Sequence, residues 1–407
     1  MKAVGMVVEY NPFHNGHLYH LQQTKKETNA ECLIAVMSSH FVQRGEPALV
    51  SKWARTKMAL AGGVDLVVEL PYPFAVQTAD MFAHGAISIL DALHCQEICF
   101  GSEHGNIDHF LEAVHLLKQY EQEHNQRLKQ LLESGMSYAK AYATALGQLQ
   151  NEQSTLDLSK PNNILSFHYV KAIVEQQSNM TPKTIQRIVA HYHDSHLPNE
   201  ETIASATSIR HHLQTDGLQS ISSYVPPTTK EELQRYYTVY GTFHYWEHYF
   251  PLLKYRLLTI NLEELHQIAE VEEGLEHRLK KAIQQAKSFR EFLTCVKTKR
   301  YTWTRLQRVC THILTNTTKK EMNFIRAYKK ATYIRLLGMN ENGQRYLRKM
   351  KKKLKLPLIT KVATLQNDPI YKLEQKAAQA YVSILPEPLL TEALQMEYAT
   401  PPLRKLT

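Results

Sequence analysis

The chain has 407 residues, of which 43% are hydrophobic and 21% charged, an ordinary balance for a globular protein of two or three domains. No apolar run reaches the roughly 18 residues that a membrane helix needs, and the apolar start AVGMVV is too short for a signal peptide. The five cysteines are scattered and odd in number, which favours a reducing compartment. We therefore expect a cytoplasmic protein.

The net charge of +9 is unevenly distributed along the chain. Residues 1–225 carry 16 Lys and Arg against 22 Asp and Glu, whereas residues 226–407 carry 32 against 17. We expect two domains, divided near Pro226–Pro227, with the basic second one binding an extended polyanion such as RNA.

Short apolar runs alternate with amphipathic stretches in residues 1–225, which predicts an α/β domain with a Rossmann-like parallel sheet. The expected strands are Ala3–Val8, Cys32–Met37, Leu66–Leu70, Glu97–Phe100 and Ile185–Ala190. The expected helices are His17–Lys26, Val50–Ala61, Thr78–Leu90, Ile107–Gln119 and a long one over Gln126–Leu149. Ligands of such sheets bind at the carboxyl ends of the strands.

Residues 226–407 show mainly helical periodicity, including the Lys- and Arg-rich stretch 300–355. Pro357–Leu365 is a candidate strand. We therefore expect a mostly helical, basic RNA-binding domain after the parallel-sheet domain.

The sequence EYNPFHNGHLYH follows the first expected strand. Asn11 is a good N-cap and Pro12 suits the first helical position, so a helix should begin here. His14 and His17 would then share one face near the helix N-terminus, where backbone N–H groups attract anions. Gly16 would leave room for a nucleotide. The alternative is that the histidines are capping or core residues and that the glycine is incidental.

The histidine–any–glycine–histidine pattern in this position resembles the HIGH-type nucleotidyltransferase superfamily. The segment ASATSIRHHL resembles the second signature of that superfamily. Ser205 and Thr207 can cap a helix and face phosphate, and Arg210 would neutralise pyrophosphate. Local capping alone is the alternative for this segment.

Other candidate ligand contacts follow along the chain. Gly101 lies where the fourth strand should end, although a plain turn glycine explains it equally well. Asn162 or Asn163 precedes a helix and either contacts a nucleotide or caps that helix. Arg187 ends a strand and is a candidate phosphate or base contact.

We predict no metal-ligating residues. Two clusters lack the paired spacing of a structural zinc site, namely His94, Cys95 and Cys99, and His191, His193 and His196.

Five blocks, VVEYNPFHNGHLYHL, MSSHFVQRGEPALVSKWARTKMAL, GVDLVVELP, FGSE and KPNNIL, together resemble the bacterial tRNA(Met) cytidine acetate ligase family. The resemblance covers most of residues 1–225, and FVQRGEPALVSKWAR is its most discriminating block. It implies an enzyme that converts acetate and ATP to acetyl-adenylate and transfers the acetyl group to N4 of the wobble cytidine, position 34, of elongator tRNA(Met).

The resemblance also implies roles for residues. His14, His17 and Arg210 would be catalytic, holding the phosphates and stabilising charge that moves onto pyrophosphate. The implied ATP-binding set is Val7, Glu9, Asn11, His14, Gly16, His17, His20, Gly101, Asn162, Arg187, Ser205 and Thr207. Mg²⁺ is a plausible counter-ion of pyrophosphate, although no carboxylate pair in the sequence fixes its place.

The tRNA would bind basic segments that also carry Tyr, Trp and Phe, which grip phosphates and stack on unpaired bases. The candidates are Lys297, Lys299, Arg300, Arg305, Arg308, Lys351, Lys352 and Lys353. A solvated charged helix face is the alternative. Residues 40–55, including Gln43, Arg44 and Lys52, are expected to form an acceptor-side loop near the acetyl group, or else a structural loop.

Two other functions share some of these features. A small-molecule adenylyltransferase acting on a phosphorylated metabolite would need the motifs of residues 1–225 but not the basic remainder. A non-catalytic RNA-binding factor regulated by ATP would bind tRNA without releasing pyrophosphate.

Overall fold

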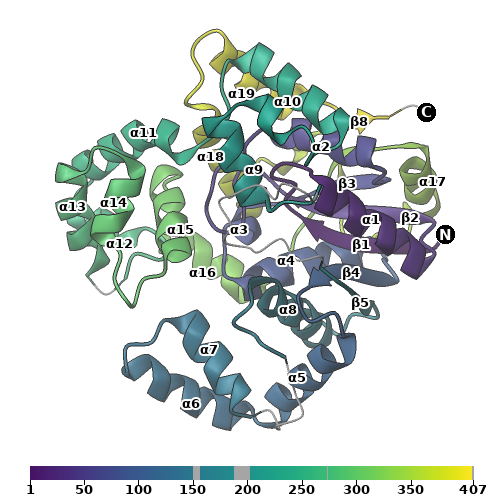
Figure 1. The fold of residues 1–407 in the computed structure, drawn as a ribbon, viewed down its shortest axis with the longest axis horizontal. Helices are drawn as coiled ribbons and strands as arrows, with labels where there is room; N and C mark the ends of the chain where they lie inside the picture. The colour runs from purple at the N-terminus through teal and green to yellow at the C-terminus, as the bar shows by residue number, and fades with distance from the viewer. Residues whose placement is uncertain (150–155, 188–201, 273, 406–407) are drawn as a thin grey trace.

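The computed structural model describes residues 1–149, 156–187, 202–272 and 274–405. Its centre is an eight-stranded sheet in the order β5-β4-β1-β2-β3-β6-β7, with β8 paired to β6 (Figure 1). The first five strands are parallel: β1 (Ala3–Val8), β2 (Cys32–Ser38), β3 (Leu66–Leu70), β4 (Glu97–Ser102) and β5 (Thr181–Gln186). The predicted α/β class and parallel sheet are confirmed.

The central strands are almost entirely apolar, apart from Ser38 in β2 and Glu69 in β3, as expected for a parallel sheet that is covered on both faces. Alternate residues face two separate cores. One core lies under α1 (Asn15–Thr28), α2 (Lys52–Gly62), α9 (Ala206–Thr215) and α10 (Pro227–Tyr240). The other lies under α4 (Ala79–Ala92), α5 (Ile107–Gln119) and α8 (Pro161–Glu175) and extends into the helical lobe described below.

The second part of the chain completes the sheet. β6 (Ile334–Met339) runs antiparallel to β3, and β7 (Leu358–Ile359) and β8 (Leu403–Arg404) run parallel to β6. The expectation of continuous helix over 300–355 is wrong at IRLLGM, a short apolar run whose periodicity cannot distinguish a buried strand from a helix. α10 begins at the predicted boundary, Pro226–Pro227. Strands from both sides of this boundary nevertheless form one sheet.

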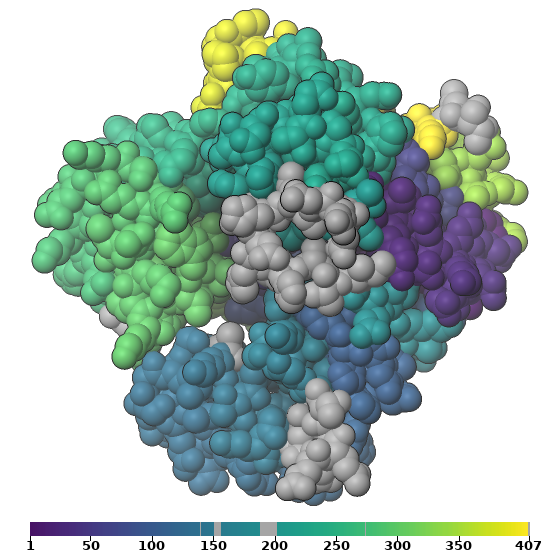
Figure 2. Space-filling view, in the orientation of Figure 1, coloured from purple at the N-terminus to yellow at the C-terminus, as the bar shows by residue number. Residues whose placement is uncertain are grey.

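Two helical lobes stand beside the sheet, and Figure 2 shows them as separate masses, green and blue. The blue lobe holds α5, α6 (Glu121–Glu133) and α7 (Tyr138–Gly147). The green lobe holds α11 (Trp246–Thr259), α12 (Leu262–Gln267), α13 (Leu275–Gln285), α14 (Phe289–Val296), α15 (Trp303–Leu314) and α16 (Lys319–Tyr328). The remaining helices are α3 (Tyr72–Ala75), α17 (Glu341–Met350), α18 (Pro369–Val382) and α19 (Leu389–Ala399), with 3₁₀ turns at Leu218–Ile221 and Val362–Leu365.

Three other sequence predictions need correction. The long helix over Gln126–Leu149 is two helices, because Gly135 adopts a φ of +87° that ends α6. β5 (Thr181–Gln186) begins four residues before the expected strand Ile185–Ala190, because its parallel pairing with β4 runs from Thr181 to Gln186; residues 188–190 lie outside the described part of the chain. Only Leu358 and Ile359 of the candidate strand Pro357–Leu365 form one.

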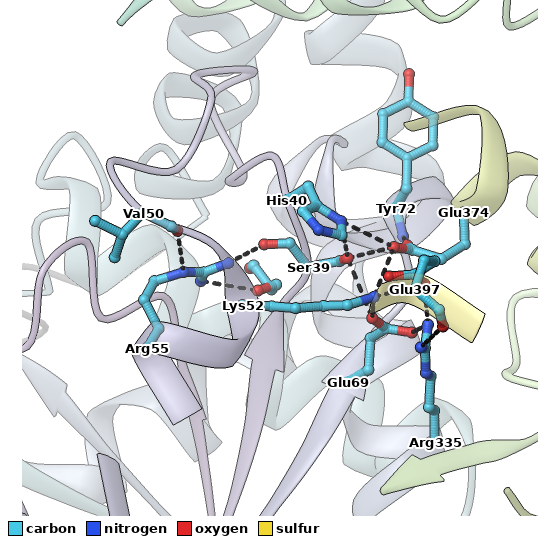
Figure 3. A network of polar contacts seen from close by, with 11 residues as sticks. Ser39, His40, Val50, Lys52, Arg55, Glu69, Tyr72, Arg335, Glu374 and Glu397 are labelled. Atoms are coloured by element: carbon cyan, nitrogen blue, oxygen red, sulfur yellow. Dashed lines mark hydrogen bonds and ion pairs between the residues drawn. The ribbon is translucent and has the colours of Figure 1, made fainter. Parts of the chain in front are cut away.

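A buried ionic network joins the C-terminal helices to the sheet (Figure 3). Lys52 Nζ lies 2.5 Å from Glu69 Oε1 and 2.9 Å from Glu397 Oε1. Arg335 from β6 contacts Glu69 and Glu397, and Glu374 from α18 accepts the backbone N–H of Tyr72 at 2.6 Å. Although burial opposes ionisation, Arg335 and Lys52 hold the pKa of Glu397 at about 2. The network therefore fixes α18 and α19 against β3 and α2.

Among the described residues, none of the helices has both the length and the apolar character needed to cross a bilayer.

We expect Glu397→Gln to lower the free energy of unfolding by about 3 kcal/mol, because it leaves the buried cations Lys52 and Arg335 with too few carboxylates. Guanidinium denaturation measures this change. The control is Lys355→Ala, which removes a partly exposed ion pair with Asp91 and should cost at most about 1 kcal/mol. Equal losses in the two variants would contradict this role of the network.

Candidate active site

The N-terminus of α1 is built by its two histidines. His14 is the N-cap, and its Nδ1 accepts the N–H of Gly16 at 3.0 Å, while Nδ1 of His17 accepts the N–H of His14 at 3.3 Å. The predicted cap at Asn11 and first turn at Pro12 are therefore wrong. Asn11 instead accepts the N–H of Leu49 at 2.7 Å, so its side chain is committed to a neighbouring loop.

Gly16 makes room for a protein side chain. A Cβ at this position would lie 2.9 Å from Cε1 of His14 and 3.4 Å from Ile203. The space beside Gly16 was expected to admit a nucleotide. In this structure the imidazole of His14 occupies that space. The glycine allows that imidazole to fold back onto the helix end.

The imidazoles of this site are neutral at neutral pH. Burial, together with the smaller effect of the charges of Arg187 and Arg210, lowers the pKa of His14 to about 3. Desolvation also lowers the pKa of His17 well below its ordinary value and that of His20 to about 4. Because Nδ1 of His14 accepts a backbone N–H, its proton is inferred to lie on Nε2, which can donate to a ligand oxygen.

His20 Nε2 is buried and has no hydrogen-bond partner among the residues that the structure describes, although His20 lines the large cleft described below. An unsatisfied buried polar atom of this kind costs about 1–3 kcal/mol, so its position favours a polar ligand.

The N-terminus of α1 forms one wall of the site, and β4, α8 and the end of β5 form the second wall. The N-terminus of α8 is capped by Glu103, whose carboxylate accepts the N–H groups of Asn162 and Asn163. Arg187 donates to Asn162 Oδ1 at 3.2 Å and packs over Gly101, where a Cβ would lie 3.2 Å from it. Asn163 is 2% exposed and bound to the backbone of Asp157, so Asn162 is the amide that faces the cleft.

The third wall is α9. Ser205 is its N-cap and accepts the N–H of Ser208 at 3.0 Å, as its position in the sequence predicts. Arg210 donates to the carbonyl of Asn11 at 2.9 Å and forms an ion pair with Glu46 at 2.8 Å. Arg210 therefore reaches the end of β1 from a helix 199 residues away, and a carboxylate holds it there.

These groups open into one cleft of about 1860 Å³ at the carboxyl ends of the parallel strands. All of the predicted ATP-binding residues line it: Val7, Glu9, Asn11, His14, Gly16, His17, His20, Gly101, Asn162, Arg187, Ser205 and Thr207. Pockets for small molecules usually measure about 300–1,000 Å³. The cleft therefore has room for a nucleotide and part of a larger substrate.

The far side of the cleft is basic. Arg300 and Arg305 line it, and Arg305 stacks on Tyr301 with 4.9 Å between the guanidinium and the ring centroid. Arg308 also lines it but is buried in a two-point pair with Glu270, at 3.0 and 2.8 Å, so much of its charge is already compensated. Lys297 and Lys299 are exposed in the loop before α15.

Lys351, Lys352 and Lys353 lie elsewhere. α17 begins beside Asp65, at the amino end of β3, and the carbonyl of Lys353 accepts from His94 at the start of β4. These lysines are exposed at the edge of the sheet opposite the cleft. Their contact with tRNA stays a prediction, but the structure does not bring them together with the other candidates.

The family model described as HIGH Nucleotidyl Transferase matches residues 1–396. The tRNA(Met) cytidine acetate ligase of Anoxybacillus flavithermus is 64% identical over 99% of this chain and 100% of its own length. The chain belongs to the tRNA(Met) cytidine acetate ligase family of HIGH nucleotidyltransferases. The Bacillus subtilis ligase is 50% identical over 99% of this chain and 97% of its own length.

Solved structures agree with this family. The apo crystal structure of Thermotoga maritima TmcAL matches with a TM-score of 0.93 at 32% identity, covering 100% of both chains. A second form, bound with alpha-thio ATP, matches with a TM-score of 0.91. The resemblance drawn from the sequence blocks is confirmed.

The loop between β2 and α2 of this ligase-family chain (residues 39–51, the β2–α2 loop) enters the cleft. Gln43 donates its N–H to Glu9 Oε1 at 2.8 Å, and Arg44 lines the cleft nearby. Burial raises the pKa of Glu9, opposed by Gln43 and Arg44. Lys52, expected beside the acetyl group, is instead fully buried in the ionic network.

One group of the described residues has the spacing of a metal site, namely Asp80, His84 and Glu175. Lys171 Nζ already lies 2.7 Å from Asp80 and 3.0 Å from Glu175, so an ammonium compensates the carboxylates. These donors therefore do not suit a divalent cation. Of the clusters discounted from the sequence, Cys95 and Cys99 are buried free thiols, and His191, His193 and His196 lie outside the described residues.

Two residues of the site escaped the sequence reasoning. Glu46 holds Arg210, and Glu103 caps α8 beside Asn162. Both are acidic, whereas reasoning about a phosphate site searched for donors and cations. The only sequence signal was their place in family-like blocks, FVQRGEPALV and FGSE.

We expect the free energy of unfolding to fall by about 2 kcal/mol between pH 7.5 and 5 because of His14 alone. The unfolded chain protonates this imidazole below about pH 6.5, while the folded pKa of about 3 prevents protonation, so acid favours unfolding. Urea denaturation of His14→Gln should show a smaller pH dependence by this amount. The matched control is His115→Gln, on the exposed surface of α5, and an unchanged pH dependence in His14→Gln would contradict the burial argument.

Proposed function

We propose that this chain activates acetate with ATP and transfers the acetyl group to N4 of the wobble cytidine, position 34, of elongator tRNA(Met). The observation that carries the proposal is one continuous cleft with two different walls. One side holds His14 and His17 at the start of α1, Arg187 at the end of β5 and Arg210 on α9, and the other carries the basic residues of α15. Membership of the ligase family supports the same reaction.

In the first step, an acetate oxygen attacks the α-phosphorus of ATP. The bond to the β-phosphate oxygen breaks, leaving acetyl-adenylate and pyrophosphate. His14 donates from Nε2 to phosphate oxygens, and Arg187 and Arg210 compensate the negative charge that moves onto pyrophosphate. The negative phosphates would raise the pKa of these imidazoles. The hydrogen bonds from the imidazoles to the phosphate oxygens would strengthen as negative charge develops on those oxygens.

In the second step, N4 of cytidine attacks the acetyl carbon, AMP leaves with the bonding electrons, and N4 loses a proton. Neither step needs a covalent bond to the enzyme. The tRNA would reach the anhydride from the basic wall, past Arg300 and Arg305, which offer phosphate contacts at the mouth of the cleft.

Mg²⁺ would enter as a counter-ion on the triphosphate. Glu9 is hydrogen-bonded to the backbone of the β2–α2 loop, and Glu46 is paired with Arg210. These carboxylates are already engaged, so we assign no protein ligand to the ion.

Incubation with labelled acetate, ATP and tRNA tests the proposal. Acetyl label should appear in tRNA as N4-acetylcytidine, with release of AMP and pyrophosphate. Adenylylation of a small phosphate ester instead would support the small-molecule adenylyltransferase. Binding of tRNA without acetate-dependent release of pyrophosphate would support a non-catalytic factor.

We expect His17→Ala to lower acetate-dependent pyrophosphate exchange by about 100-fold or more, because a positioned donor near the phosphates is lost. Affinity for tRNA should change little, since the basic wall of α15 is untouched and a retained affinity shows that the variant folds. Exchange at the wild-type rate would remove His17 from the mechanism.

We expect Glu46→Gln to tighten ATP binding about fivefold, because phosphates must otherwise displace this carboxylate from Arg210. Isothermal titration measures the affinity. Glu272→Gln is the control, since Glu272 pairs with Arg305 in the same cleft at 3.6 Å without touching the phosphate residues. Weaker ATP binding in Glu46→Gln would mean that the carboxylate positions Arg210 instead of competing for it.

A further inference from the structure

Two large aromatic side chains stand on the outer face of α16. Phe324 and Tyr328 are 52% and 53% exposed, one helical turn apart, whereas Met322 and Ile325 on the inner face are buried. Single exposed aromatic residues are common on protein surfaces. A pair at i and i+4 forms a continuous apolar strip that the amphipathic pattern of this helix does not require.

Basic residues surround this strip. Lys320 precedes Phe324 by one turn on the exposed face, and Lys330 is exposed just after the helix. Arg326 and Lys329 line the large cleft, whereas Phe324 and Tyr328 do not, so the segment that carries the strip borders the cleft. Glu321 is the only acidic residue in the α16 sequence, and it is bound to Lys376 at 2.7 Å and to Thr318.

We propose, on the basis of the proposed function, that Phe324 and Tyr328 form a platform on which unpaired bases of the tRNA anticodon loop stack. Aromatic faces stack on any base, and the lysines and arginines around them suit the phosphates between those bases. The platform would hold the loop while its wobble cytidine enters the cleft that Arg326 and Lys329 line.

Charge complementarity favours RNA over a second copy of this chain. A symmetric contact through the α16 face would bring Lys320 and Lys330 of two copies together, which like-charge repulsion opposes. An RNA loop supplies both negative charge and planar apolar surface. Nearby Arg305 already stacks on Tyr301, which continues the same chemistry along the wall.

Binding of a fluorescent anticodon stem-loop of tRNA(Met) to the full-length chain tests this platform. We expect Phe324→Ala and Tyr328→Ala each to weaken binding about fivefold or more, without changing its salt dependence, because no phosphate contact is lost. Lys320→Ala should instead flatten the salt dependence by about one charge. Tyr255→Ala is the matched control, since Tyr255 is 69% exposed on α11, and it should bind as wild type.

Acetate-dependent pyrophosphate exchange without RNA separates this inference from the proposed function. Phe324→Ala and Tyr328→Ala should exchange at the wild-type rate. If both bind the stem-loop as tightly as Tyr255→Ala, or if they dissociate an oligomer of the wild-type chain, the platform is overturned while the proposed function stands. A wild-type chain that exchanges nothing and binds no stem-loop would overturn both.

Discussion

The geometry of the site depends on one buried guanidinium. Arg55 is fully buried and donates to the carbonyl oxygens of Glu9 at 2.7 Å, Ser38 at 2.9 Å and Val50 at 3.3 Å. It also donates to the carbonyl of Ser39, and Figure 3 shows the guanidinium between Val50 and Ser39. Carbonyl groups at the ends of strands have no partners within the sheet, and burying them unpaired is costly. A single planar donor therefore fixes the ends of β1 and β2 and both ends of the β2–α2 loop.

The β2–α2 loop connects Arg210 of α9 to the helical lobe formed by α11–α16. The carbonyl of Gly45 accepts from Trp246 at 3.0 Å and from Thr311 at 2.7 Å. Gly45 has a φ of +80°, and a Cβ there would lie 2.6 Å from the backbone of Arg308. The next residue, Glu46, holds Arg210. The two sides of the cleft, which carry Arg210 and the basic residues of α15, are therefore joined through Gly45 and Glu46, although they lie far apart in the sequence.

The errors made from the sequence share a physical cause, which is competition among partners. Asn11 is a good cap by type, but a neighbouring loop offers it a backbone N–H and His14 takes the helix end. Lys52 was expected in a loop near the acetyl group, but it is buried and forms ion pairs with Glu69 and Glu397. Arg308 was predicted to contact tRNA, but Glu270 compensates its charge. Local rules cannot rank partners that come from distant segments.

The sequence by itself determined the parallel sheet, most of its strands, the family and a set of residues that line one cleft. Apolar runs of strand length and the HNGH motif encode these features over a few consecutive residues. Only the tertiary structure decided that β6 from the basic part joins β3, that Glu46 meets Arg210 and that Lys351–Lys353 lie at the opposite edge of the sheet. Such pairings depend on chain closure over 100 residues or more, which no local pattern specifies.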